Sequence, residues 1–178
     1  HRFDVLAFTE TWYTDSSDVI PFAGYTCEGM YRVNRTGGGV SLYFRDGFSY
    51  EVLSEYSNVN DCCESIVVKC AGSIVALIYR PPSGSVYDFV AYIDEFLENV
   101  EPLNSPVTLI GDFNIDLLSS SPIRRIFLDV IQTHGCKNVI DSPTRVTSES
   151  QTLIDLCITS YPSDHIIAGI LTCELSDH

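Results

Sequence analysis

Short apolar runs rich in β-branched residues alternate with polar turns along most of the chain, and they predict more strands than helices. Ala71-Gly72 separates two such runs, and Gly37 to Gly39 precedes another; both turns indicate antiparallel hairpins. The triple glycine has the flexibility to approach a phosphate, but no helix N-terminus follows it, so a hairpin is favoured. The predicted strands cover residues 3–8, 25–33, 40–45, 65–70, 73–79, 107–110 and 153–158.

Two segments carry apolar residues at helical spacing. The first begins at Ser85, where Asp88 completes an approximate capping box, and its stripe runs to Val100. The second begins at Ser121-Pro122 and ends at His134-Gly135, where His134 is more typical of a C-terminal cap than of a catalytic group. Each helix is apolar on one side and is expected to pack on a sheet. The pattern predicts an α/β sandwich with mixed or antiparallel sheets.

Length and charge refine this expectation. The 178 residues suit a single domain spanning residues 1–178. Ten Lys and Arg against 24 Asp and Glu give a formal charge of −14, which argues against a strong stand-alone DNA binder. Carboxylates that hold a metal ion add to such an acidic count, and a tethered neighbouring domain can supply affinity.

The cysteines and the apolar runs indicate in which cellular compartment the protein is expected. The seven cysteines are odd in number and lack a C-x-x-C spacing, which favours buried free thiols of an intracellular protein over a disulfide framework. No apolar run approaches the ~20 residues that a membrane span needs, and the N-terminus lacks the pattern of a signal peptide. We therefore expect no membrane partner.

One polar motif follows a buried strand directly. Gly111-Asp112-Phe113-Asn114-Ile115-Asp116 comes after the run 107–110, and its glycine permits a sharp turn. Asp112 and Asn114 lie two positions apart, so they can aim a carboxylate and an amide to one side. Such a pair can hold a divalent metal, a water or a phosphate. The alternative is an ordinary turn, in which Asp116 would be a loop carboxylate.

Other predicted strands also end at polar residues. Glu10 stands where the first strand opens into a loop, although a plain exposed glutamate is the alternative. Pro81-Pro82 halts the strand that carries Tyr79 and Arg80, whose hydroxyl and guanidinium are able to donate to phosphate oxygens; the alternative for Tyr79 is a rim aromatic. Asp155 lies in an apolar strand, and because a buried unpaired carboxylate is costly, it should have a His or Arg partner.

Five polar motifs follow one another along the chain beside predicted strands: Thr9-Glu10-Thr11-Trp12, Tyr79-Arg80-Pro81-Pro82, Gly111 to Asp116, Leu153-Ile154-Asp155 and Ser176-Asp177-His178. Taken in order, these motifs resemble the endonuclease/exonuclease/phosphatase superfamily over residues 3 to 178. The detail is most similar to the endonuclease domain of non-LTR (LINE-type) retrotransposons, in which Pro-Thr-Arg followed by Thr-Leu-Ile-Asp also recurs. The resemblance implies a four-layer α/β/β/α sandwich of the deoxyribonuclease I type and a hydrolase that cleaves phosphodiesters with Mg²⁺, or Mn²⁺ as an alternative.

The resemblance also implies roles for the residues that would act on the water and on the metal. Glu10 would bind the metal, and Asp177 would lie beside it or assist the water. Asp112 would orient and deprotonate the attacking water. Asp155 would be the partner of His178, holding the imidazole for charge stabilisation or acid/base catalysis. A carboxylate beside an imidazole raises the histidine pKa, which keeps it cationic near neutral pH.

A second group of residues would contact the DNA. Tyr79 would hydrogen-bond the scissile phosphate, and Arg80 would donate to phosphate oxygens. Asn114 would fix Asp112 and contact the phosphate. Thr144 or Thr147 would correspond to a family threonine near the DNA, with Thr147 taken as the candidate.

Two departures from the family predict that the chain is a fragment truncated at both ends. The family begins with an Asn-bearing strand and continues past Ser-Asp-His into a final strand. The expected function is a DNA-nicking endonuclease that acts beside a covalently linked reverse transcriptase domain, in the nucleus. The alternatives are a phosphoesterase acting on inositol phosphates or sphingolipids and an inactive relic; the Tyr-Arg-Pro-Pro and Pro-Thr-Arg details favour DNA.

Overall fold

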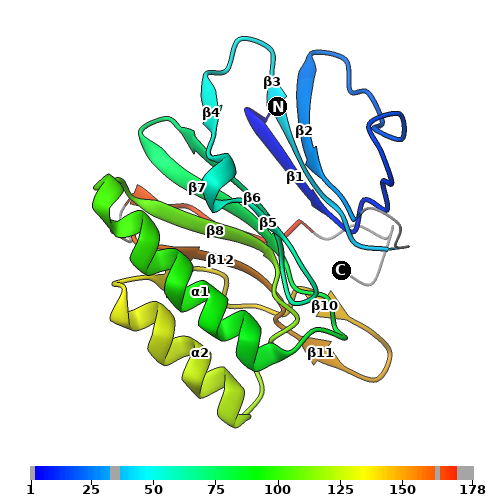
Figure 1. Ribbon diagram of the computed structural model, residues 1–178. Coiled ribbons are helices and arrows are strands. Elements are labelled where there is room, and N and C mark those ends of the chain that lie inside the picture. The colour runs from blue at the N-terminus through cyan, green and yellow to red at the C-terminus, as the bar shows by residue number, and fades with distance from the viewer. Residues whose placement is uncertain (1–2, 33–36, 163–164, 172–178) are drawn as a thin grey trace.

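The computed structural model describes residues 3–32, 37–162 and 165–171, and its described part contains two sheets packed face to face (Figure 1). The smaller sheet has the order β1-β3-β2 and is antiparallel throughout. Its strands are β1 (Val5–Thr9), β2 (Tyr25–Met30) and β3 (Val40–Arg45). The glycine turn that follows β2 leads into β3, and β2 and β3 pair as the predicted hairpin.

The larger sheet has seven strands in the order β4-β6-β7-β8-β12-β9, with β5 paired to β6. Neighbours are antiparallel except β7 and β8, which are parallel because α1 connects them as a crossover. A separate two-stranded hairpin joins β10 (Arg145–Val146) to β11 (Gln151–Thr152). The strands of the large sheet are β4 (Tyr50–Val52), β5 (Asn58–Val59), β6 (Glu64–Cys70), β7 (Ser73–Tyr79), β8 (Val107–Asp112), β9 (Lys137–Asn138) and β12 (Asp155–Thr159).

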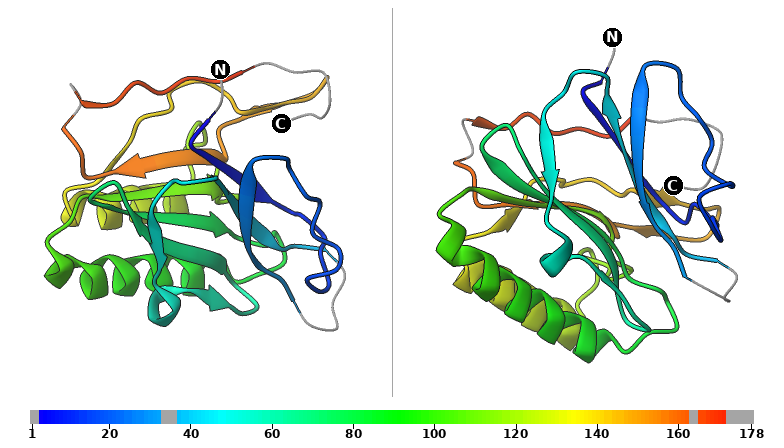
Figure 2. Two further views of the ribbon diagram at one scale, coloured as in Figure 1. Left: turned by 90° about the horizontal axis from the view of Figure 1, so that it is seen from above. Right: turned by 45° about the horizontal axis from the view of Figure 1, so that its top comes forward.

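The helices α1 (Val86–Val100) and α2 (Pro122–Thr133) lie side by side on one face of the larger sheet (Figure 2). Both predicted caps are confirmed: Ser85 Oγ accepts from the Asp88 N–H and Ser121 Oγ from the Arg124 N–H, each at 3.3 Å. His134 is the C-cap of α2, as expected, and its Nε2 lies 2.8 Å from Asp94 Oδ1 on α1. The short 3₁₀ helices η1 (Ser54–Tyr56) and η2 (Glu101–Leu103) complete the described helical elements.

Side-chain alternation along β7 divides the core in two. Ile78 belongs to the cluster between the large sheet and the helices, together with Phe89 and Phe127. Leu77 and Tyr79 belong to the cluster between the two sheets. Because successive strand residues point to opposite faces, the last residue of β7 presents its side chain to the space between the sheets.

The expected α/β sandwich is confirmed, with mixed strand directions in the larger sheet. The described residues make three of the four expected layers: one pair of helices, the large sheet and the small sheet (Figure 2). All six described cysteines are free thiols, as predicted, but only Cys63, Cys70 and Cys136 are buried; the other three are partly exposed, and Cys173 lies outside the described residues. Within that described part, neither α-helix combines the length and the apolar character that crossing a membrane would require.

Candidate active site

Polar side chains occupy one level of the larger sheet on four neighbouring strands. The strand register places Glu64 beside Tyr79, Tyr79 beside Asp112, and Asp112 beside Asp155. The parallel strands β7 and β8 end at this level, and the antiparallel strands β6 and β12 begin there. Residues up to 91 positions apart, from Glu64 to Asp155, are thus brought to one edge of the sheet. We call this set the carboxylate row.

Asn114 holds the Asp112 carboxylate at both oxygens. The Asn114 backbone N–H donates to Asp112 Oδ1 at 2.9 Å, and the Asn114 side-chain amide donates to Asp112 Oδ2 at 3.1 Å. Asn114 has a left-handed backbone with φ of 48°, which turns the chain back toward the aspartate. Asp112 is only 6% exposed. The predicted placement of both groups on one side is confirmed by this contact, and the carboxylate is fixed in orientation.

Arg80 secures the turn that carries Asp112 and Asn114. Its Nε donates to the Phe113 carbonyl at 2.8 Å and its Nη2 to the Asn114 carbonyl at 2.7 Å. Its Nη1 donates to the carbonyls of Pro81 and Gly84 at 3.1 and 3.0 Å. The Asn114 side-chain amide donates in return to the Arg80 carbonyl at 2.9 Å.

These contacts oppose the expectation that Arg80 donates to a substrate phosphate, and that contact stays a prediction. The residue is 6% exposed, and four of its donors already bind backbone carbonyls. Burial lowers the pKa of Arg80 from its usual value, and the nearby Asp112 opposes that shift. The Tyr-Arg-Pro-Pro motif therefore braces the loop after β8 through its arginine.

Glu10 and Tyr79 connect the two sheets at the same edge. The Tyr79 hydroxyl donates to Glu10 Oε1 at 2.5 Å, although 69 positions separate the two residues. Glu10 follows β1 with a left-handed φ of 53°, and its side chain is exposed. Burial and the hydrogen bond to Glu10 both raise the pKa of Tyr79 well above its usual value. Tyr79 is therefore a neutral hydroxyl donor at neutral pH.

Glu64, which sequence reasoning missed, holds the loop that follows Glu10. Its side chain is fully buried, accepts from the Gly39 N–H at 2.5 Å and forms an ion pair with Arg32. The Gly39 and Gly38 carbonyls then accept from the Thr11 and Trp12 N–H groups at 3.2 and 2.8 Å. Burial raises the pKa of Glu64, while the contacts with Gly39 and Arg32 lower it. A signal existed in the sequence, since Glu64 lies two positions before the apolar run Ile66 to Val68 of β6.

Asp155 lies next to Thr144 and not to Thr147. The Asp155 N–H donates to Thr144 Oγ1 at 2.9 Å, so Thr144 caps the start of β12 beside the row. Thr147 sits in the turn between β10 and β11, where its Oγ1 accepts from the Ser150 N–H at 3.0 Å. A DNA contact by Thr147 stays a prediction. The predicted loop role of Asp116 is confirmed, because its Oδ1 accepts from the Leu118 and Leu153 N–H groups at 2.9 and 3.0 Å.

Asp177 and His178 lie outside the described residues. Their roles, including the pairing of His178 with Asp155, stay predictions.

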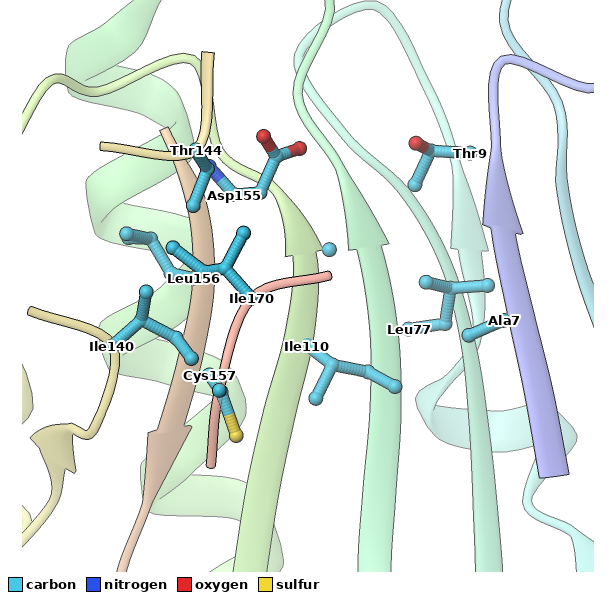
Figure 3. A pocket seen from close by; sticks show the side chains of 12 residues that line it. Ala7, Thr9, Leu77, Ile110, Ile140, Thr144, Asp155, Leu156, Cys157 and Ile170 are labelled. Carbon is cyan, nitrogen blue, oxygen red and sulfur yellow. The ribbon is translucent and has the colours of Figure 1, made fainter. Parts of the chain in front are cut away.

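A cavity of about 400 Å³ opens between the two sheets beside Asp155 (Figure 3). Ala7 and Thr9 of β1 line one side, and Leu156 and Cys157 of β12 line the other. The Asp155 carboxylate and the Thr9 hydroxyl lie toward the same end of the cavity, and the labelled residues of its other end are apolar apart from the Cys157 thiol (Figure 3). Asp155, at one end of the carboxylate row, therefore borders an open space rather than packed side chains.

The donor groups of the site suit a hard divalent cation. The carboxylates of Glu10 and Asp112 offer oxygen atoms, which Mg²⁺ prefers over nitrogen or sulfur. Among the residues that the structure describes, no three His, Cys, Asp or Glu side chains surround one point. Because Mg²⁺ keeps several waters and commonly takes only one or two carboxylates, this donor set fits such an ion. Glu10 is the exposed carboxylate of the site.

Solved structures of nucleases share this architecture. The endonuclease domain of TRAS1, a telomere-specific non-LTR retrotransposon, aligns over 88% of this chain and 78% of its own, with a TM-score of 0.66 and 13% identity. The 3′–5′ exonuclease NExo from Neisseria meningitidis aligns over 88% and 76%, with a TM-score of 0.65 and 16% identity. An AP endonuclease from Archaeoglobus fulgidus aligns over 88% of this chain and 76% of its own, with a TM-score of 0.61 and 15% identity. At these identities, the likeness shows the fold.

The sequence comparisons reach further than the fold. No curated protein sequence matches the chain. The profile of the Endonuclease/Exonuclease/phosphatase family, however, matches residues 1–178, which is the whole chain. With the carboxylate row and the sandwich that carries it, this match means that the chain belongs to the endonuclease/exonuclease/phosphatase family.

Proposed function

We propose that the chain is a metal-dependent endonuclease that nicks DNA, and that it serves a non-LTR retrotransposon. The observation that supports this most is the contact between Glu10, Tyr79 and the Asp112–Asn114 pair at one edge of the sheet. The likeness to the TRAS1 endonuclease domain and the Tyr-Arg-Pro-Pro and Pro-Thr-Arg motifs favour DNA as the substrate.

In this proposal each residue performs one part of phosphodiester hydrolysis. Asp112, held in orientation by Asn114, takes a proton from the water whose oxygen attacks phosphorus. Tyr79 remains a neutral donor and turns its hydroxyl from Glu10 to a non-bridging phosphate oxygen. His178, paired with Asp155, gives a proton to the departing sugar oxygen as the P–O bond breaks.

Glu10, with Asp177, would hold the divalent cation. The cation itself would neutralise charge on the phosphate oxygens.

The resemblance also supports two expectations about context. A charge of −14 disfavours binding to DNA phosphates, and a reverse transcriptase domain in the same polyprotein would supply much of the DNA affinity that this chain lacks. Action on genomic DNA would place the protein in the nucleus.

A plasmid nicking assay tests the proposal. Supercoiled plasmid with Mg²⁺, with Mn²⁺ and with EDTA should be converted to the open circle in the first two cases alone. Asp112→Asn should lower the rate by about a hundredfold or more, because a positioned base typically contributes that much. Asp129→Asn, which changes an exposed carboxylate on α2, is the matched control and should nick like the wild type.

A panel of inositol phosphates and phospholipids, assayed in parallel, separates the alternatives. Turnover of these compounds with no plasmid conversion would overturn the nuclease proposal in favour of a phosphoesterase. Equal nicking by the wild type and Asp112→Asn would overturn the site assignment, and no turnover of any substrate would indicate an inactive relic.

A further inference from the structure

The loop after β1 presents Trp12 to solvent two residues beyond Glu10. Its side chain is 64% exposed, although tryptophan is among the side chains that gain most from burial. We infer that Trp12 is a DNA-binding residue that stacks on a nucleobase flanking the scissile phosphate. This inference rests on the proposed function. It adds a stacking contact between the indole and the face of a base to the contacts with the phosphate.

The backbone of Trp12 is held rigidly, unlike that of an ordinary surface loop. Its φ of 59° is left-handed, a conformation that costs a bulky residue free energy. Its N–H donates to the Gly38 carbonyl at 2.8 Å, and the Gly39 turn is in turn held by the buried Glu64. On the other side, the Tyr13 hydroxyl bonds the Tyr43 hydroxyl at 3.1 Å and accepts from the Ile20 N–H at 3.2 Å. These contacts therefore fix the backbone that carries the exposed indole.

The same contacts fix the position of Trp12 relative to the chemistry. Glu10, Thr11 and Trp12 share one short segment, whose anchors are the glycine turn and the Tyr79 hydroxyl. The Tyr79 hydroxyl bonds Glu10, and Trp12 lies two residues beyond Glu10. In this inference, a nucleotide whose phosphate lies at Tyr79 therefore places a neighbouring base against Trp12. Flat aromatic rings suit that position, because every base offers a π-face and stacking is tolerant of sequence.

Charge favours stacking over phosphate binding in this chain. Of ten Lys and Arg, Arg80 is buried among carbonyls and Arg32 is paired with the buried Glu64. Arg45 is paired with Asp4 on the surface. Nucleic-acid binding commonly combines phosphate contacts by cations with stacking by aromatics. With Arg32 and Arg80 engaged inside the fold, an exposed aromatic next to Glu10 supplies a contact that these two cations do not.

The sequence makes this inference directly measurable, because Trp12 is the single tryptophan of the chain. Titration of the Asp112→Asn protein in Mg²⁺ with a fluorescently labelled duplex oligonucleotide gives two signals. DNA anisotropy reports binding, and tryptophan emission reports the environment of Trp12 alone. We expect the emission to be quenched and to saturate at the same DNA concentration as the anisotropy. Binding without a change in emission would overturn the inference.

Nicking kinetics supply the second test. Trp12→Ala should raise KM about tenfold or more, as loss of a base stack typically does, with kcat changed little. Trp12→Phe should restore most of the affinity, because it retains a flat ring. The control is Tyr87→Ala, which removes an equally exposed aromatic (64%) from α1 and should leave KM unchanged.

A failure of the stacking role can be distinguished from a failure of the proposed nuclease function. An unchanged KM in Trp12→Ala, with wild-type nicking intact, would overturn the stacking role and leave the proposed function standing. A wild-type protein that binds and nicks no DNA would overturn both.

Discussion

At the scale of single residues, the site is built on backbone conformations that most side chains avoid. Glu10 and Asn114 are left-handed, and Gly111 has a φ of 133°. At Gly111 a Cβ would collide with the carbonyl of Ile78 on β7, so only glycine lets β7 and β8 approach there. Such strain persists where surrounding contacts over-determine it, and at this site the contacts are those of Arg80 and Asn114. The strained turn places the backbone N–H and the side-chain amide of Asn114 against the Asp112 carboxylate.

The bracing role of Arg80 can be separated from a phosphate-binding role by kinetics. Arg80→Lys should lower kcat of plasmid nicking about tenfold to a hundredfold, because a compact ammonium cannot reach four carbonyls and a slightly misplaced base is costly. KM should change little, since the guanidinium is buried away from substrate. Arg125→Lys, an exposed arginine of α2, is the control. A raised KM with an unchanged kcat would restore the phosphate-binding role.

Arg80 and Glu64 also show which part of the site could be predicted from sequence. The motifs identified Asp112, Asn114, Glu10 and Tyr79, because polar residues at the ends of apolar runs are visible in a linear pattern. The direction in which Arg80 points was not visible, since it depends on carbonyls up to 34 positions away. Glu64 was missed for the same reason: its partners, Gly39 and Arg32, become neighbours only when the two sheets pack.

At the scale of elements, the observed hairpins and helices agree closely with those that the sequence predicts. Ala71-Gly72 joins β6 to β7, and Ser85 and Ser121 cap α1 and α2, because turn and cap chemistry is local. The order of strands in the larger sheet was not predictable in this way. It arises from the parallel crossover through α1 and from the insertion of β12 between β8 and β9. These long-range pairings create the carboxylate row.

The hydrogen bond between Glu64 of β6 and the Gly39 N–H gives a prediction for how the stability of the fold depends on pH. Burial raises the pKa of Glu64 in the folded protein, so the folded state retains this proton to higher pH than the unfolded state does. Stability from this group is therefore fully present below the ordinary glutamate pKa of about 4.3 and is lost as pH rises through the folded value. The free energy of unfolding of the wild type, relative to Glu64→Gln, should be higher at pH 5 than at pH 7.5.

Urea denaturation followed by circular dichroism measures this difference at the two pH values. Glu55→Gln, which removes an exposed acidic charge in η1, serves as the control for net charge. A wild-type advantage that grows toward pH 7.5 would mean that Arg32 and Gly39 outweigh burial and that the pKa of Glu64 is lowered.

At the scale of the whole molecule, two sheets and one helical layer bring a small set of polar groups to a single edge. Tyr79 is the residue common to these parts: it ends a strand of the large sheet, belongs to the core between the sheets and bonds Glu10 of the small sheet. The cavity beside Asp155 lies at the same edge. The packing of the sandwich therefore sets the distance between Glu10 and the carboxylate row, because each stands on a different sheet.

Net charge then determines how this edge engages DNA. Each phosphate contacted by a cation adds about 0.9 to the slope of log affinity against log salt concentration. With a charge of −14, and with Arg32 and Arg80 engaged inside the fold, we expect few such contacts and a slope shallower than about −3. Anisotropy titrations of a labelled duplex with the Asp112→Asn protein, from low to physiological salt, measure it. A slope of about −6 or steeper would show that cations elsewhere on the chain form an extended phosphate track, and base stacking would then be a minor source of affinity.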